Sequence, residues 1–113
     1  MKKFTQAPLL LMSTLISFSA TADEICEYSI TRIAIGASGT IRLTALSHPG
    51  YFSICNVQNT VNSTSVNTCQ GWLSQAHVAL TTGKKLEVFY PTGTNCQTHS
   101  NNPKPNWIVL KSD

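Results

Sequence analysis

Apolar and polar residues alternate along several short stretches of this chain, and a period of two predicts β-strands. The clearest case is TIRLTAL at residues 40–46, where Ile41, Leu43 and Ala45 alternate with polar neighbours. A turn-rich segment containing Gly36 precedes it, so the two alternating stretches around that turn form a predicted β-hairpin. The predicted strands cover residues 28–36, 40–46, 51–57, 84–90 and 107–110.

The pattern changes to a helical period after residue 69. Apolar residues in QGWLSQAHVALTTG, at 70–83, recur three or four positions apart, which predicts an amphipathic helix of about three turns. Gly83 is placed to end this helix. Trp72 is therefore predicted to be a core residue rather than a sugar-stacking one. The expected buried face consists of Trp72, Leu73, Ala76, Ala79 and Leu80.

The predicted order of elements is three strands, one helix and two strands, with a turn at residues 47–50. This is the order of an OB-fold, an all-β domain with one helix in which five strands form a small Greek-key barrel. The helix closes one end of that barrel. A β-sandwich would need about seven strands. We therefore expect one disulfide-bonded OB-fold domain.

The first 22 residues, MKKFTQAPLLLMSTLISFSATA, have the features of a secretory signal peptide. Two lysines precede an apolar run, and the segment ends in the small-residue pattern Ala-Thr-Ala. The run is too short, and too broken by polar residues, to span a membrane comfortably. We therefore expect residues 1–22 to be cleaved and residues 23–113 to form the mature domain. That product would be secreted or periplasmic and would not insert into a membrane.

The expected mature domain is nearly neutral. The full sequence has 8 basic and 5 acidic residues, a formal net charge of +3. Lys2 and Lys3 lie in the predicted signal peptide, so the net charge of the mature domain falls to +1. Domains that bind nucleic acid usually carry a strongly basic face. Charge therefore gives no support for a nucleic-acid partner.

The four cysteines, Cys26, Cys55, Cys69 and Cys96, all follow the predicted cleavage site. An even number of cysteines in a small exported domain indicates two disulfide bonds, for which three pairings are possible. A zinc site is the alternative explanation. The separations of 29, 14 and 27 residues contain no C-x-x-C motif, which disfavours zinc.

Residues suited to catalysis are sparse. The mature aspartates are Asp23 and Asp113, near the two ends, and the thiols are expected to form disulfides, so no catalytic triad can be assembled. The three histidines, His48, His77 and His99, are scattered along the sequence. No carboxylate pair is placed for the hydrolysis of a glycosidic bond. We therefore expect a non-catalytic protein that uses no cofactor and no metal ion.

The thirteen residues between Cys55 and Cys69 are polar but uncharged. They are four Asn, five Ser or Thr, one Gln and three Val. Amide and hydroxyl groups offer both donors and acceptors, which is what sugar hydroxyls require. One interpretation is therefore a glycan-binding surface, with Asn59, Thr60, Asn62 and Thr64 as the candidate contacts. The alternative is a solvated hairpin or loop held by a disulfide bond.

Several segments resemble the B subunits of AB5 toxins. GYFSICNVQNTVNSTSVNTC, at 50–69, is similar to the subtilase-cytotoxin and typhoid-toxin type, in which a Tyr-Phe pair precedes a cysteine that is followed fourteen residues later by another. ITRIAIG before it and TTGKKLEVFY after it resemble the same subunits, so the resemblance covers residues 28–90. CEYSIT and FYPTGTNC resemble the cholera type, in which an early cysteine followed by Glu-Tyr is bridged to one after the fourth long strand.

The resemblance implies an OB-fold subunit that assembles with copies of itself as a ring of five, binds a cell-surface glycan and carries a toxin A subunit. It implies that Cys26 pairs with Cys96 and that Cys55 pairs with Cys69. It also implies glycan contacts in an early strand, near Tyr28 and Ser29, as well as between the paired cysteines. Tyr28 is the candidate aromatic platform. The alternative function is an exported OB-fold module that binds or inhibits a protein.

Overall fold

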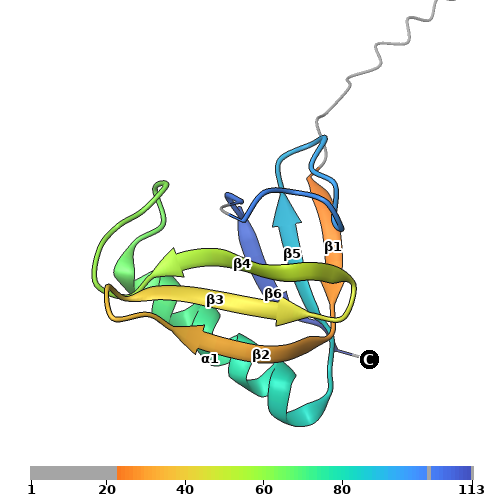
Figure 1. The fold of residues 1–113 in the computed structure, drawn as a ribbon, viewed down its shortest axis with the longest axis horizontal. Helices are drawn as coiled ribbons and strands as arrows, with labels where there is room; N and C mark the ends of the chain where they lie inside the picture. Colours follow the sequence, from red (N-terminus) through yellow and green to blue (C-terminus); the bar gives the residue numbers. More distant parts are fainter. Residues whose placement is uncertain (1–22, 102, 113) are drawn as a thin grey trace, which may run out of the picture.

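The computed structural model describes residues 23–101 and 103–112, so the predicted signal peptide lies outside the described residues. The elements are, in chain order, β1 (Glu24–Tyr28), β2 (Ile30–Ile35), β3 (Thr40–Ala45), β4 (His48–Asn56), α1 (Val66–Thr82), β5 (Leu86–Tyr90) and β6 (Trp107–Leu110). The prediction of a mostly β domain with one helix is confirmed (Figure 1).

The strands form two antiparallel three-stranded sheets. One sheet has the order β1-β5-β6 and the other has the order β2-β3-β4. Figure 1 shows α1 behind the β2-β3-β4 sheet, and α1 also contacts β5 and β6. The face of β2-β3-β4 that points away from α1 is therefore the outward face of this sheet.

The predicted barrel of five strands differs from the observed sheets. The first predicted strand, residues 28–36, corresponds to β2 and the last residue of β1, and the rest of β1 was not predicted. Ser29 separates β1 from β2, and the two strands pair in different sheets. Among the described residues no ladder joins β4 to β6. Instead, the Ser53 N–H donates a hydrogen bond to the Asn101 carbonyl (2.7 Å), which ties β4 to the segment before β6. The two sheets therefore do not close into a barrel.

The core is formed by the inner faces of both sheets together with α1. Leu43, Phe52 and Val88 are fully buried there. Burying an apolar side chain of this size stabilises the folded state by about 1.5–3 kcal/mol. The alternation predicted for residues 40–46 is confirmed, because Ile41 and Ala45 are buried beside Leu43 while their polar neighbours face outward.

Helix α1 begins at Val66, one turn earlier than predicted. The Ser65 hydroxyl accepts a hydrogen bond from the Thr68 N–H (3.1 Å), which satisfies one of the free amides of the first turn. Gly83 ends the helix as predicted, with a φ of 77° that suits glycine. In the described part of the chain, no helix is both long enough and apolar enough to cross a membrane.

The buried face of α1 agrees with the prediction except at one end. Trp72 is 8% exposed, as expected of a core residue, and Ala76 and Ala79 are buried with it. The prediction was wrong for Leu80, which is 36% exposed. Leu80 follows the buried Ala76 by four residues, so it lies at the edge of the buried face, two residues before the end of α1. Cys69, which precedes the predicted helix, belongs to the buried face instead.

Both implied disulfide bonds are present. Cys26 and Cys96 join β1 to the segment after β5, with a Cα–Cα distance of 5.4 Å. Cys55 and Cys69 join β4 to α1, with a Cα–Cα distance of 5.5 Å. Closing the shorter loop stabilises the fold by about 3 kcal/mol, and closing the longer one by somewhat more. The described residues include no free cysteine, so no thiolate remains to bind zinc.

Candidate functional site

The polar segment between Cys55 and Cys69 folds into a short hairpin that leads into α1. The Val61 N–H donates to the Thr64 carbonyl (3.2 Å), and the Thr64 N–H donates to the Val61 carbonyl (2.9 Å). Between them, Asn62 has a φ of 53° and the next residue a φ of 67°. This left-handed backbone is that of a two-residue hairpin turn, and Asn adopts it more readily than most residues.

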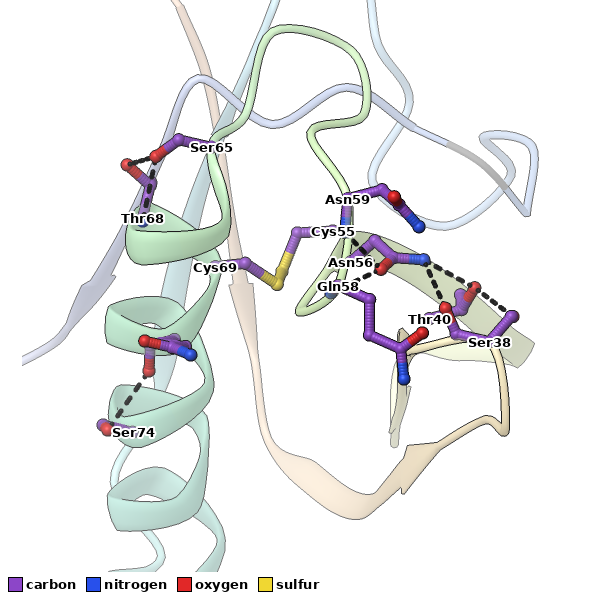
Figure 2. Close-up of a disulfide and its surroundings, with 11 residues drawn as sticks. Ser38, Thr40, Cys55, Asn56, Gln58, Asn59, Ser65, Thr68, Cys69 and Ser74 are labelled. Carbon is purple, nitrogen blue, oxygen red and sulfur yellow. Dashed lines mark hydrogen bonds between the residues drawn. A yellow bond between two sulfur atoms is a disulfide. The ribbon is translucent and has the colours of Figure 1, made fainter.

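Asn56 anchors this loop to the rest of the sheet. Its Oδ1 accepts hydrogen bonds from the backbone N–H groups of Gln58 (2.7 Å) and Asn59 (3.0 Å). Its Nδ2 donates to the Ser38 carbonyl (3.1 Å) and lies 3.4 Å from the Thr40 hydroxyl. Figure 2 shows Asn56 pointing toward Ser38 and Thr40, beside the disulfide that leads to α1. One side chain therefore fixes the start of the loop against the turn between β2 and β3.

Gly39 makes this close approach possible. Its φ is 92°, and a Cβ at this position would lie 2.7 Å from Asn56 Oδ1 and 2.8 Å from Gln58 Cγ. The Val57 N–H also donates to the Gly39 carbonyl (2.9 Å). Only glycine combines this backbone conformation with the absence of a side chain. The turn before β3 and the loop after β4 are thus packed against each other.

A hollow of about 320 Å³ lies where the loop meets β3 and β4. We call it the polar hollow. Its size is at the lower end of the range of about 300–1,000 Å³ that is typical of small-molecule sites. Its polar groups are neutral amides and hydroxyls, which suit a neutral polar ligand. It is lined by Thr40, Ser53, Ile54, Cys55, Asn56, Val61, Asn62 and Pro103.

The predicted glycan contacts are only partly brought together. Asn59, Thr60 and Asn62 are exposed in the loop, and of these only Asn62 lines the polar hollow. Thr64 is 8% exposed and has little surface for a ligand. Ser29 is half-buried between β1 and β2 and does not line the hollow. Asn62 is therefore the predicted residue with the best placement for binding.

Tyr28, the predicted aromatic platform, is fully buried on the inner side of β1, so no face of its ring is open to a ligand. Its ring centroid lies 4.9 Å from that of Phe52. Its hydroxyl lies 2.8 Å from the Cys96 carbonyl oxygen and 2.9 Å from His99 Nε2. Burial raises the pKa of Tyr28 to about 12. The residue therefore belongs to the core.

Two of the three histidines lie side by side in this core region. The ring centroids of His48 and His99 are 4.3 Å apart, and both rings pack against Phe52. Burial lowers the pKa of His99, and the neighbouring His48 lowers it further, against a hydrogen bond to the Ser100 carbonyl that raises it. Within the described residues, no three or more His, Cys, Asp or Glu side chains are grouped so as to hold a metal ion.

Two exposed features were not identified from the sequence. The outward face of β2-β3-β4 carries Arg32, Arg42 and Tyr51, all exposed. On the other sheet, Trp107 is 64% exposed and lies opposite Phe89. The alternation in residues 40–46 indicated an outward Arg42, but the neighbours of that residue depend on strand register, which the sequence does not give.

A scan of protein-family models and searches of curated proteins and of solved structures found no match to this chain.

Proposed function

We propose that this chain is an exported, non-catalytic glycan-binding protein whose polar hollow contacts a neutral sugar residue. The observation that carries the proposal is the lining of the hollow. It combines the Asn62 amide and the Ser53 hydroxyl with the apolar side chains of Ile54 and Val61. Sugar rings present hydroxyl groups and apolar C–H faces together, and this lining matches both. The two disulfides are compatible with an extracellular or periplasmic location.

The rigidity of the hollow supports the same proposal. Asn56 and the Cys55–Cys69 disulfide hold the loop from two sides. A site that is already ordered loses less conformational entropy when a ligand binds. Each neutral hydrogen bond exchanged with water still contributes only about 0.5–1.5 kcal/mol. One site would therefore bind weakly, and several copies on one particle would bind a glycan-coated surface much more strongly.

The strand arrangement adds an argument at the level of the fold. Because one residue separates β1 from β2, we infer that they are two halves of the bent first strand of an open OB-fold. The ligand face of OB-folds is formed by their second and third strands, together with the loops after the first and fourth. The corresponding parts here are β3, β4, the turn before β3 and the segment after β5. Three of these parts contribute to the lining of the polar hollow, namely β3 with Thr40, β4 with Ser53 and the segment after β5 with Pro103.

The test of the polar hollow is a double substitution that spares the backbone. Asn62→Gly keeps the left-handed turn and removes the amide, and Ser53→Ala removes the hydroxyl. A matched control, Gln70→Ala with Ser74→Ala, removes one amide and one hydroxyl from the exposed side of α1. We expect the first variant to lose binding on an array of neutral and acidic oligosaccharides, while the control retains it. Equal binding by all folded variants would contradict the proposal.

A specific observation favours a protein partner as the second candidate function. Ile25, Phe89 and Trp107 lie directly opposite one another across β1-β5-β6. Ile25 is 50% exposed and Trp107 is 64% exposed. We call this row the apolar stripe. Adjacent exposed apolar side chains of this kind are typical of protein interfaces.

Under the resemblance to AB5 subunits, the apolar stripe would contact another copy of the chain in a ring of five, or a toxin A subunit. Under the alternative, it would contact the target of an exported binding or inhibitory module. Competition by free oligosaccharide separates glycan binding from protein binding. The mass of the purified chain in solution separates self-association from binding to a different protein. If the chain is a monomer at micromolar concentration, the apolar stripe does not join copies of the chain, and a different protein is the remaining candidate.

A further inference from the structure

The outward face of β2-β3-β4 carries a basic cluster next to the polar hollow. In the register of the sheet, Arg32 lies opposite Thr44, and Thr44 lies opposite Tyr51. Arg42 lies opposite Ala34, two residues along the same strand as Thr44. Directly opposed residues share a face, as do residues two apart on one strand. All five side chains therefore lie on one surface.

These side chains surround a second hollow of about 300 Å³, which we call the arginine hollow. The Arg42 guanidinium carbon lies 4.4 Å from the centroid of the Tyr51 ring, a cation–π contact that restricts where this guanidinium can point. Ala34 and Gly50 also line the hollow, and a Cβ at Gly50 would meet nothing within 4 Å. These two small residues therefore leave their side of the hollow unfilled.

No carboxylate balances this charge on its own sheet. The sequences of β2, β3 and β4 contain two arginines and no Asp or Glu. The acidic residues that the structure describes, Asp23, Glu24, Glu27 and Glu87, belong to β1, β5 or the residue before β1. Arg32 and Arg42 are diagonal neighbours, and such neighbours on adjacent strands lie about 7–8 Å apart. That spacing applies to the residues and not to the guanidinium groups, but two like charges on neighbouring positions of one face repel each other, and an anion between them relieves the repulsion.

The two guanidinium groups select the geometry of the anion. A planar carboxylate presents its two oxygens in one plane, so a second arginine must bond to oxygens that already accept from the first. A tetrahedral sulfate ester has three terminal oxygens, so it can accept hydrogen bonds from two arginines that approach from different strands. The Thr44 hydroxyl lines the same hollow and is a further donor. The lining therefore fits a sulfate group better than a carboxylate.

The position of the arginine hollow connects it to the polar hollow. Arg42 lies directly opposite Ser53 in the sheet, and Ser53 lines the polar hollow. The two hollows are thus neighbours on one face, one with neutral donors and acceptors and the other with two cations. We propose that the arginine hollow binds the sulfate ester of a sulfated glycan, a role that rests on the proposed glycan-binding function.

The test uses the full mature chain and immobilised heparin as the sulfated probe. The charge-removing variant is Arg32→Gln with Arg42→Gln, and its matched control, Lys84→Gln with Lys85→Gln, removes the same charge at the end of α1. We expect the arginine variant to bind heparin at least about 10-fold more weakly, and the lysine control to stay within about 3-fold of the parent chain. Equal losses in both variants would show non-specific attraction and overturn the proposal, as would no loss in the arginine variant.

A second variant keeps the test decisive if the glutamine variant unfolds. Arg32→Lys with Arg42→Lys preserves the charge and removes both forks, so heparin binding should still weaken. Unchanged binding by this folded variant would contradict sulfate recognition. Three alternative probes are duplex DNA, inorganic phosphate and hyaluronate. Hyaluronate has carboxylates and no sulfates. Binding of any of them as tight as that of heparin would overturn the assignment of a sulfated glycan.

The failure of this inference differs from the failure of the proposed function. The double variant Asn62→Gly with Ser53→Ala, called the Asn62 variant below, should lose its binding of neutral sugars but keep most of its affinity for heparin. If the arginine variant still binds heparin and the Asn62 variant no longer binds neutral sugars, only the proposal for the arginine hollow is contradicted. If the Asn62 variant binds neutral sugars as the parent chain does and the arginine variant no longer binds heparin, the proposal for the polar hollow is contradicted and the proposal for the arginine hollow stands.

Discussion

At the scale of single residues, the most connected polar side chain near the site is Asn56. It is 8% exposed and binds the loop on one side and the turn before β3 on the other. Asn56→Ala leaves two backbone amides and one carbonyl without this partner. We expect the free energy of unfolding to fall by about 2–3 kcal/mol. Urea unfolding measures this change.

The neighbouring Asn59→Ala is the control for that experiment. Its side chain is exposed, and its backbone N–H, which bonds to Asn56, is unaffected by the substitution. Surface substitutions of this kind usually change stability by less than about 0.5 kcal/mol. A loss for Asn59→Ala as large as that for Asn56→Ala would mean that the amide network around Asn56 is not what holds the loop.

His99 gives the residue-scale prediction for pH. Its ring packs against His48, Phe52 and Tyr90 and lies 2.9 Å from the Tyr28 hydroxyl, and burial lowers its pKa. The unfolded chain therefore binds more protons than the folded one as pH falls below about 6.5. Stability should decrease from there down through the lowered pKa of the folded state.

Unfolding free energies measured between pH 4 and pH 8 test this expectation. His99→Gln removes the titrating group, so its stability should depend less on pH in that range than that of the parent chain. His77→Gln, on the exposed side of α1, is the matched control, and a change of slope equal to that of His99→Gln would contradict the expectation. An unchanged slope in His99→Gln would mean that His99 does not contribute to the acid sensitivity.

Single residues were the hardest level to predict from sequence. The exposure of Asn62 agrees with the composition of its segment, because uncharged polar residues at a turn usually face water. Tyr28 was not predictable in the same way, because its hydroxyl bonds to Cys96 and His99, which lie about seventy residues further along the chain. Contacts over that distance depend on strand pairing, which no local pattern encodes.

At the scale of elements, the helix is the part whose packing can be tested most directly. Trp72 is 8% exposed on the buried side of α1, whereas Leu80 is 36% exposed. Trp72→Ala should lower the free energy of unfolding by about 3–5 kcal/mol because it leaves a cavity in the core. Leu80→Ala, on the same helix, should lower it by much less. A stable Trp72→Ala protein that has lost only ligand binding would show that Trp72 is a binding residue.

Periodicity predicted the type of most elements, and their ends less well. The alternation in residues 40–46 and 84–90 corresponds to β3 and β5, because one face of each strand is buried. The start of α1 was missed because Val66 and Cys69 are separated by polar residues that resemble a loop. The turn predicted at residues 47–50 is largely the start of β4. Pairing with β3 extends that strand through a proline and a glycine, which local propensity disfavours.

At the scale of the whole molecule, the order of elements was predictable but the closure of the barrel was not. The division at Ser29 lets β1 and β2 pair in separate sheets, and nothing in the sequence of residues 28–36 marks this break. The same separation divides the charged residues, with both strand arginines on one sheet and the acidic residues that the structure describes at the other. Sheet assignment was needed before that distribution could be seen.

The last prediction concerns binding by an assembly of chains. If the apolar stripe joins copies of the chain, Trp107→Lys should give a monomer, because it places a charge in the exposed row formed with Ile25 and Phe89. Binding to a glycan-coated surface should then weaken by about 10²–10⁴, while binding of a free oligosaccharide in solution stays the same. Leu46→Lys, at a 78% exposed position outside the stripe, is the control and should change neither mass nor binding. Sedimentation gives the mass, and surface binding and solution titration are measured on the same samples. Unchanged surface binding by a monomeric Trp107→Lys protein would contradict the dependence of glycan binding on assembly.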